Sequence, residues 1–194
     1  MNNIDIIKSN FDESQKVNSL CSENILKSIE ITTIKIIKML ENSGKLLACG
    51  NGGSSGDAQH IVSEFINRFE TERKPLAAVS LNSDTATLTS IANDYGYKYV
   101  YSKQVKAIAN TNDILMVFTT SGNSENILDA IAAAKLKAVP VILLSGGDGG
   151  KASKLLNEND TKIIVPSTRT SRIQEIHLII IHSICECIDK HMSK

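Results

Sequence analysis

An imidazole and a carboxylate stand four positions apart in the segment "CGNGGSSGDAQHIVSEF", residues 49–65, where they are His60 and Glu64. If a helix begins near Ser54 or Ser55, both side chains lie on one face, one turn apart, and can converge on one point. This pair suits a borderline divalent metal such as zinc, and Glu64 alone could serve as a general base. For an isolated pair, an ordinary surface contact is the better interpretation. The position of this pair one to two turns beyond a loop at the predicted site edge makes the two interpretations comparable, and the chemistry depends on further partners.

The apolar C-terminal segment is the richest source of such partners, with Gln174, Glu175, His177 and His182. Gln174 and His182 are separated by about 80° around a helix, so they can reach the same side. Gln174 with His177 is another possible pair, and His182 with Glu186 repeats the His-x-x-x-Glu spacing. A histidine within "LIIIHSI" is most often a buried structural residue, and the spacing leaves these alternatives open.

A second chemical signal is the stretch "TTSGNSEN", residues 119–126. A helix that begins near Ser124 would add free N–H groups and the positive end of its dipole to the hydroxyls before it, which makes an anion site suited to a phosphate monoester. The simpler interpretation is a serine N-cap with Gly122 and Asn123 as turn residues. The number of hydroxyls at one strand end favours phosphate, and they belong to Thr119, Thr120, Ser121 and Ser124.

The glycines of the first segment could instead bind a nucleotide. Their pattern, G-x-G-x-x-x-G from Gly50 to Gly56, is not the dinucleotide spacing, and no Lys-Ser/Thr follows as in a Walker loop. Asp84 could imitate a ribose-binding acid, but it comes a few residues into its loop. We therefore interpret "GNGG" as a loop over which the backbone approaches a sugar phosphate.

These residues must be positioned by strands and helices that the apolar pattern predicts. Near-continuous apolar runs that alternate with helical segments indicate a parallel sheet covered on both faces. We predict an α/β fold, a doubly wound five-stranded parallel sheet flanked by helices, in which ligands bind beyond the carboxyl ends of the strands. The predicted strands are 45–50, 75–81, 113–120, 139–146 and 161–166, and polar loops follow three of them at 50–56, 119–126 and 145–150.

Helices are predicted on either side of this sheet, at about 5–20 and 22–42 and in one long C-terminal segment, 171–191. We expect a single domain over residues 1–194, in which 1–43 form N-terminal helices and 44–194 form the sheet core and the last helix. The terminal helices either form a subunit interface or wrap their own sheet.

The overall charge excludes some classes of protein, because Lys plus Arg and Asp plus Glu are both 21 and the formal net charge is zero. This argues against binding to nucleic acid or to an anionic membrane through net charge. We see no apolar run long enough to span a bilayer and no secretory leader, so we expect a cytoplasmic protein with no membrane and no nucleic-acid partner. We expect reduced, mostly buried thiols at Cys21, Cys49, Cys185 and Cys187.

Five motifs in order, "CGNGGSSGDAQH", "ANDYGY", "TTSGNS", "SGGDGGK" and "RIQEIHLIIIH", resemble the sugar isomerase (SIS) domain family and, within it, the heptose-phosphate isomerases. The resemblance runs from about residue 40 to the C-terminus. It implies a SIS-type αβα sandwich and a homotetramer with sites at subunit contacts. The implied reaction converts sedoheptulose 7-phosphate to D-glycero-D-manno-heptose 7-phosphate through an enediol, on the route to nucleotide-activated heptose for lipopolysaccharide or capsule.

The resemblance also assigns roles to residues. It implies one zinc ion per subunit, with Glu64 as base at one carbon and His182 as its acid/base partner. Thr119 stands where the family is expected to have serine, which keeps the hydroxyl. The implied zinc ligands are His60, Glu64, Gln174 and His182, and the implied substrate contacts are Asn51, Gly52, Gly53, Glu64, Asn93, Asp94, Thr119, Thr120, Ser121, Ser124 and Gln174.

Two other functions are compatible with the motifs. One is a non-catalytic SIS-type binding protein, such as a relative that acts in replication initiation, which could keep the phosphate loop without needing the metal set. The other is isomerisation of a different phosphosugar. The joint presence of His60, Glu64, Gln174 and His182 argues against the first.

Overall fold

A computed structural model describes residues 2–193 and contains a five-stranded parallel sheet with the strand order β2-β1-β3-β4-β5. This confirms the predicted α/β class, although each strand is shorter than the predicted apolar run. The strands lie on either side of β1, so the crevice between the carboxyl ends of β1 and β3 is a topological switch point. The strands are β1 (Leu46–Gly50), β2 (Ala78–Ser80), β3 (Ile114–Phe118), β4 (Val141–Gly146) and β5 (Thr161–Val165).

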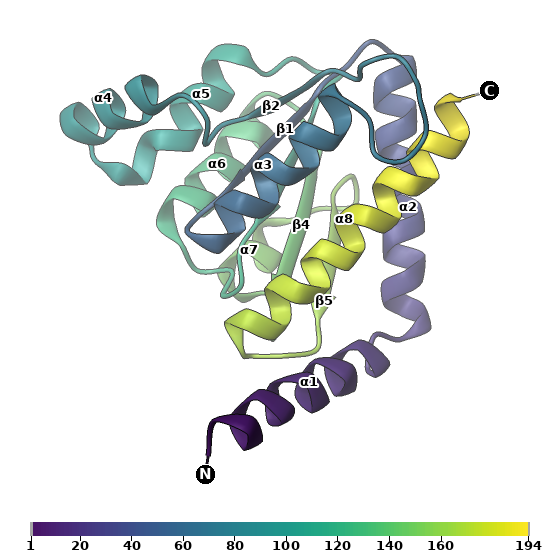
Figure 1. Ribbon diagram of the computed structural model, residues 1–194. Helices are drawn as coiled ribbons and strands as arrows, with labels where there is room; N and C mark the ends of the chain where they lie inside the picture. The colour runs from purple at the N-terminus through teal and green to yellow at the C-terminus, as the bar shows by residue number, and fades with distance from the viewer. Residues whose placement is uncertain (1, 194) are drawn as a thin grey trace.

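Helices cover both faces of the sheet, which explains why its central strands are apolar throughout (Figure 1). In β3, Met116 and Phe118 pack with one group of helices, whereas Leu115 and Val117 pack with the other. The first group is α2 (Glu23–Glu41), α3 (Gly53–Ile66) and α8 (Thr170–Met192). The second is α4 (Thr85–Tyr95), α5 (Val100–Ile108), α6 (Glu125–Leu136) and α7 (Gly150–Leu155), with the short 3-10 helix η1 (Tyr97–Tyr99) between α4 and α5.

The terminal helices divide between the two roles considered for them. In α2 and α8, Ile36 and Ile180 are buried in the chain's own core, as expected of helices that wrap the sheet. The first helix, α1 (Asn3–Ser19), extends away from the sheet and leaves Phe11 75% exposed (Figure 1). It is tied to the start of α8 by Arg169, which bonds to the side chains of Glu13 and Asn10.

Helices α3 and α8 lie on the same face of the sheet, and their apolar side chains share one core cluster (Figure 1). Ile61 and Phe65 of α3 and Ile176 and Ile180 of α8 are all buried in it. The two helices that carry the predicted metal ligands are therefore held together by the core itself.

Two predictions about the whole chain can be compared with this structure. Among residues 2–193, no helix combines the length and apolarity needed to cross a membrane. All four cysteines are free; Cys49 and Cys185 are buried, Cys21 is half-buried, and Cys187 is exposed. Burial raises the pKa of the Cys49 thiol, which keeps it protonated.

Candidate functional site

A cavity of about 240 Å³ lies at the carboxyl ends of β1 and β3, at the switch point of the sheet. It brings together all the predicted substrate positions except Glu64, Asn93 and Asp94. Loops that follow different strands meet here because parallel strands end at the same edge. The lining residues are Asn51, Gly52, Gly53, Ser54, Phe118, Thr119, Thr120, Ser121, Ser124, Thr170 and Gln174.

The hydroxyl of Ser124 bears on the choice between a phosphate site and an ordinary serine cap. Ser124 is the N-cap residue of α6, yet its side chain makes no capping hydrogen bond. Its hydroxyl and the free N–H groups of the first turn are therefore available to an anion in the cavity. The Thr119 hydroxyl, by contrast, accepts a bond from the Gly122 N–H at 3.2 Å and shapes the loop.

Close contacts surround Gly122 and Gly53 at this cavity. Gly122 has φ +65°, and a Cβ there would lie 2.0 Å from the carbonyl oxygen of Gly149, in the loop after β4. A Cβ on Gly53 would lie 2.4 Å from Nε2 of Gln174. The third predicted loop, 145–150, thus packs directly against the loop 119–126. The glycine at position 53 leaves space for the Gln174 amide.

The side chain of Asn51 fixes the opening loop to the neighbouring helix. Its amide group exchanges two hydrogen bonds of 2.8 Å with the amide of Asn126, which is buried in α6. The hydroxyl of Tyr101 donates to the Gly50 carbonyl just before it. The loop after β1 therefore has a rigid position relative to the phosphate loop after β3.

His60, Glu64 and His182 form a cluster next to this cavity. Nε2 of His60 lies 3.2 Å from Oε1 of Glu64 and 3.4 Å from Nε2 of His182. His60 and Glu64 project from one face of α3, as predicted, with side chains 32% and 21% exposed. The cluster is open to solvent and can be reached by a substrate.

The structure also separates this cluster from the alternative pairs on α8. His177 is fully buried, with Nδ1 3.8 Å from Oδ2 of Asp57 and its ring edge-on to Phe118. Glu186 faces solvent and accepts a bond from Lys190 at 2.6 Å. Neither residue is part of the His60 cluster.

The donor types of the cluster suit zinc, and two of its distances agree with a shared ion. Bonds of about 2.05 Å directed to the corners of a tetrahedron hold two donor atoms about 3.3 Å apart, close to both contacts of His60. Gln174, the fourth predicted ligand, lies two turns before His182 on α8 and lines the cavity. Within residues 2–193, however, no three His, Cys, Asp or Glu side chains already surround a common point.

Asn93 and Asp94 are the predicted substrate contacts that lie neither in the cavity nor in the His60 cluster. Both are exposed near the end of α4, where the Asn93 amide donates to the Asp94 carboxylate at 2.9 Å. Tyr97 just beyond them lies 3.3 Å from Oδ1 of Asn51, so this end of α4 is beside the opening loop.

Three lining residues were not predicted from the sequence: Ser54, Phe118 and Thr170. Thr170 begins α8, directly after the loop that follows β5. A hydroxyl at a strand's carboxyl end that opens a helix is the same signal that identified Ser124. It could therefore have been found in "STRTSRIQ".

A larger cavity, of about 500 Å³, lies at the amino ends of the strands. Lys35, a half-buried residue of its lining, already donates to the carbonyls of Asn159 and Asp160 and to the Thr161 hydroxyl. Burial lowers the pKa of Lys35, and these acceptors hold its ammonium group in place. The carboxylate of Asp160 in this cavity already lies 3.6 Å from Nζ of Lys135, and the cavity lies at the edge where such folds do not bind ligands.

Comparison with known proteins gives the site a context. The SIS domain model matches residues 11–146. A phosphoheptose isomerase from Colwellia psychrerythraea is 50% identical over 183 residues, which cover 94% of this chain and 93% of that protein. The structure of a phosphoheptose isomerase from Francisella tularensis superposes with a TM-score of 0.95 at 42% identity and covers 98% and 100% of the two chains. The structure of a phosphoheptose isomerase from Neisseria gonorrhoeae superposes with a TM-score of 0.91 at 41% identity and covers 96% of this chain and 98% of that chain.

Proposed function

The chain belongs to the SIS domain family, and from this premise we propose that it is a phosphoheptose isomerase. It converts sedoheptulose 7-phosphate to D-glycero-D-manno-heptose 7-phosphate, an aldose–ketose isomerisation in heptose biosynthesis. The observation that carries this proposal is the position of the phosphate cavity beside the His60, Glu64 and His182 cluster, both on α3 and α8.

The spacing of these two parts suits this substrate. Gly53 at the cavity and His60 in the cluster are two turns apart on α3, about 10 Å along the helix axis. In a heptose 7-phosphate, the phosphate on C7 and the reacting carbons C1 and C2 lie at opposite ends of the sugar. A phosphate in the cavity therefore lets an extended sugar place C1 and C2 near Glu64 and His182.

The reaction needs a base and an acid at neighbouring carbons. A proton leaves C1 of the ketose as O2 gains one, which forms the enediol. The O1 proton then leaves as a proton is added at C2, and the carbonyl moves to C1. We assign the carbon-bound proton to Glu64 and the partner acid/base role to His182, because an imidazole can serve either as acid or as base. The phosphate loop supplies binding energy that orients the reacting carbons.

One zinc ion per subunit would be held by His60, Glu64, Gln174 and His182. When bound, it supplies a positive charge that stabilises the negative charge developing on the two substrate oxygens. The two imidazoles, the carboxylate and their spacing around His60 support this assignment. The zinc ligands and the substrate contacts, Asn93 and Asp94 included, stay predictions.

The decisive experiment is incubation of the purified protein with sedoheptulose 7-phosphate, with and without a chelator, while the aldose product is followed. We expect turnover that the chelator abolishes and that added zinc restores. A metal-free protein with no turnover would favour the non-catalytic binding role. Faster turnover of another phosphosugar would identify that sugar as the better substrate and would contradict the heptose assignment.

We further propose a homotetramer in the cytoplasm. The support for assembly is the apolar surface on α1 and α2, where Ile4, Phe11 and Ile34 are 64%, 75% and 58% exposed. Such side chains are expected to be covered by another subunit. The free thiols suit a reducing compartment. Sedimentation equilibrium tests the assembly, and cell fractionation tests the location.

A further inference from the structure

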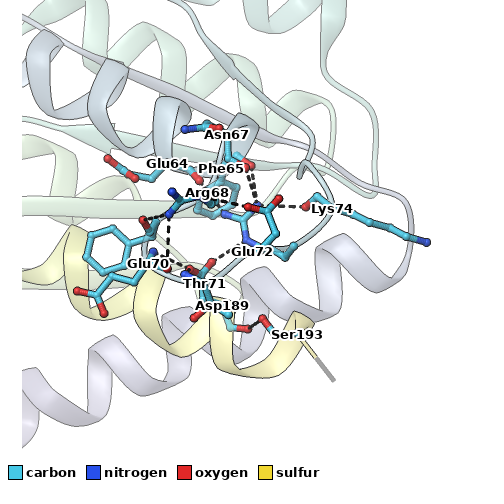
Figure 2. Close-up of polar contacts among 12 residues, drawn as sticks. Glu64, Phe65, Asn67, Arg68, Glu70, Thr71, Glu72, Lys74, Asp189 and Ser193 are labelled. Carbon is cyan, nitrogen blue, oxygen red and sulfur yellow. Dashed lines mark hydrogen bonds and ion pairs between the residues drawn. The ribbon is translucent and has the colours of Figure 1, made fainter.

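The segment 67–76, here called the strap, connects α3 to β2 and passes over the C-terminal half of α8. Its anchor is a buried ion pair in which Nε of Arg73 lies 2.6 Å from Oδ1 of Asp189, with side chains only 1% and 2% exposed. The other carboxylate oxygen of Asp189 accepts the backbone N–H groups of Glu70 and Thr71, each at 3.0 Å. Figure 2 shows these two strap residues gathered at Asp189.

The same arginine also holds the end of α3. Its Nη2 donates to the carbonyl of Glu64 at 2.7 Å, and its Nη1 donates to the carbonyl of Phe65 at 3.0 Å. Carbonyls in the last turn of a helix lack partners within the helix, and a cation there is favoured by the helix dipole. Arg73 therefore fixes the backbone of Glu64, the residue assigned as base.

The strap contacts the other half of the cluster through Phe69. Its ring stacks on the imidazole of His182, with centroids 5.4 Å apart and planes inclined by 23°. The His182 ring also meets His60 edge-on, with centroids 5.1 Å apart. Two neighbours in different directions leave the His182 ring little freedom to rotate.

Stability alone is a weak explanation for this arrangement, because a buried ion pair is often no more stabilising than apolar residues of similar size. The strap also contains an exposed pair, Arg68 with Glu72 at 3.3 Å, which contacts neither Glu64 nor His182. One pair of charges faces solvent, whereas the other is buried between the two helices that supply the reacting groups.

We propose that the strap is a positioning device for the reaction, which rests on the proposed isomerase function. Arg73 and Asp189 hold the C-terminal parts of α3 and α8 together, so that Glu64 and His182 keep the separation that the two proton transfers require. Phe69 sets the plane of the His182 imidazole. Arg73, Asp189 and Phe69 act through the cluster and do not touch the substrate.

The first test is the variant Arg73→Lys in the full-length protein. Lysine keeps the charge but loses the forked donors that reach Asp189 and the two carbonyls together. We expect kcat to fall by about 10- to 100-fold, because small displacements of reacting groups have effects of this size. KM and inhibition by inorganic phosphate should change by less than about threefold, since the cavity is untouched.

Glu72→Gln is the matched control, because it removes a charge from the exposed pair of the same strap. Its kcat should equal that of the unmodified protein. If Arg73→Lys folds and keeps kcat within about twofold, the positioning role is refuted. An unmodified protein with no isomerase activity would instead refute the proposed function, so the two failures are distinguishable.

The second test does not depend on activity. Phe69→Leu keeps an apolar side chain in the strap but removes the aromatic ring over His182. The chain has four histidines, so the His182 ring-proton resonance can be assigned with His182→Gln. We expect that resonance to move downfield in Phe69→Leu, with a lower kcat and unchanged phosphate inhibition. An unchanged resonance and an unchanged kcat would overturn the proposal, and this variant decides the matter if Arg73→Lys does not fold.

Discussion

The two ends of the α3–α8 pair differ in their proposed role and in the residue types that form them. At the cavity end, the site is made of hydroxyls, glycines and helix N–H groups in two loops that follow β1 and β3. At the cluster end, it is made of His60 and Glu64 on one helix and His182 on the other, more than a hundred residues away.

The difference lies in how each end keeps its geometry. The cavity end is fixed locally, by strand ends and by close contacts such as that of Gly122 with Gly149. The cluster end depends on the packing of two helices and on the strap that joins them through Arg73 and Asp189. Binding and chemistry should therefore respond to different substitutions.

The largest expected effect, and the clearest separation of the two ends, is that of Glu64→Gln. We expect kcat to fall by at least about 100-fold, because general base catalysis contributes an effect of that order. Inhibition by inorganic phosphate should be unchanged, since the cavity is intact. Glu186→Gln is the control, as it has the same spacing from a histidine but faces solvent. Normal turnover by Glu64→Gln would refute the assignment of Glu64 as the general base.

His182→Gln should lose bound zinc and activity, with metal affinity lower by about tenfold or more. His177→Gln should keep its zinc, because that imidazole is buried against Phe118 and points elsewhere. It should retain activity but unfold at a lower temperature. Metal content measured by mass spectrometry compares the two variants, and the reverse result would show that the other histidine is the ligand.

Ser124→Ala tests the cavity end and should have a moderate effect. Loss of one hydrogen bond to a charged group should raise KM and the phosphate inhibition constant by about tenfold, with a smaller change in kcat. Folding should be unaffected because the Ser124 hydroxyl caps nothing. Thr119→Ser is the control, since it keeps the hydroxyl. A fall in kcat alone would contradict the division between the two ends.

The smallest expected effect concerns acid stability at the cluster end. Burial raises the pKa of Asp189, but the Thr71 N–H and Arg73 outweigh it, and the net pKa is lowered. A lowered pKa means that the carboxylate stabilises the fold above its unfolded pKa, and that this contribution is lost as pH falls through the folded value. The thermal unfolding temperature should therefore fall less between neutral and acid pH in Asp189→Asn than in the unmodified protein. Equal pH dependence in both proteins would contradict this.

The sequence predicted much of the fold because its signals are local. Apolar runs located all five strands, and helical periodicity located α1, α2 and α8 to within a few residues. The cavity at the carboxyl ends of β1 and β3 was predicted from strand ends rich in glycine and hydroxyl groups, although Thr170 was overlooked there. The exposed placement of Asn93 and Asp94 on α4 could not be read from their position in a motif.

The sequence by itself determined the sheet, its ligand-binding edge and the pairing of His60 with Glu64, because each depends on neighbours within one element or at one strand end. Only the tertiary structure decided which histidine of α8 joins that pair. Spacing gives the angle between side chains around the helix, but the packing of α8 against α3 decides which of them faces His60. It likewise revealed Arg73, Asp189 and Phe69, whose contacts link residues that no local spacing connects.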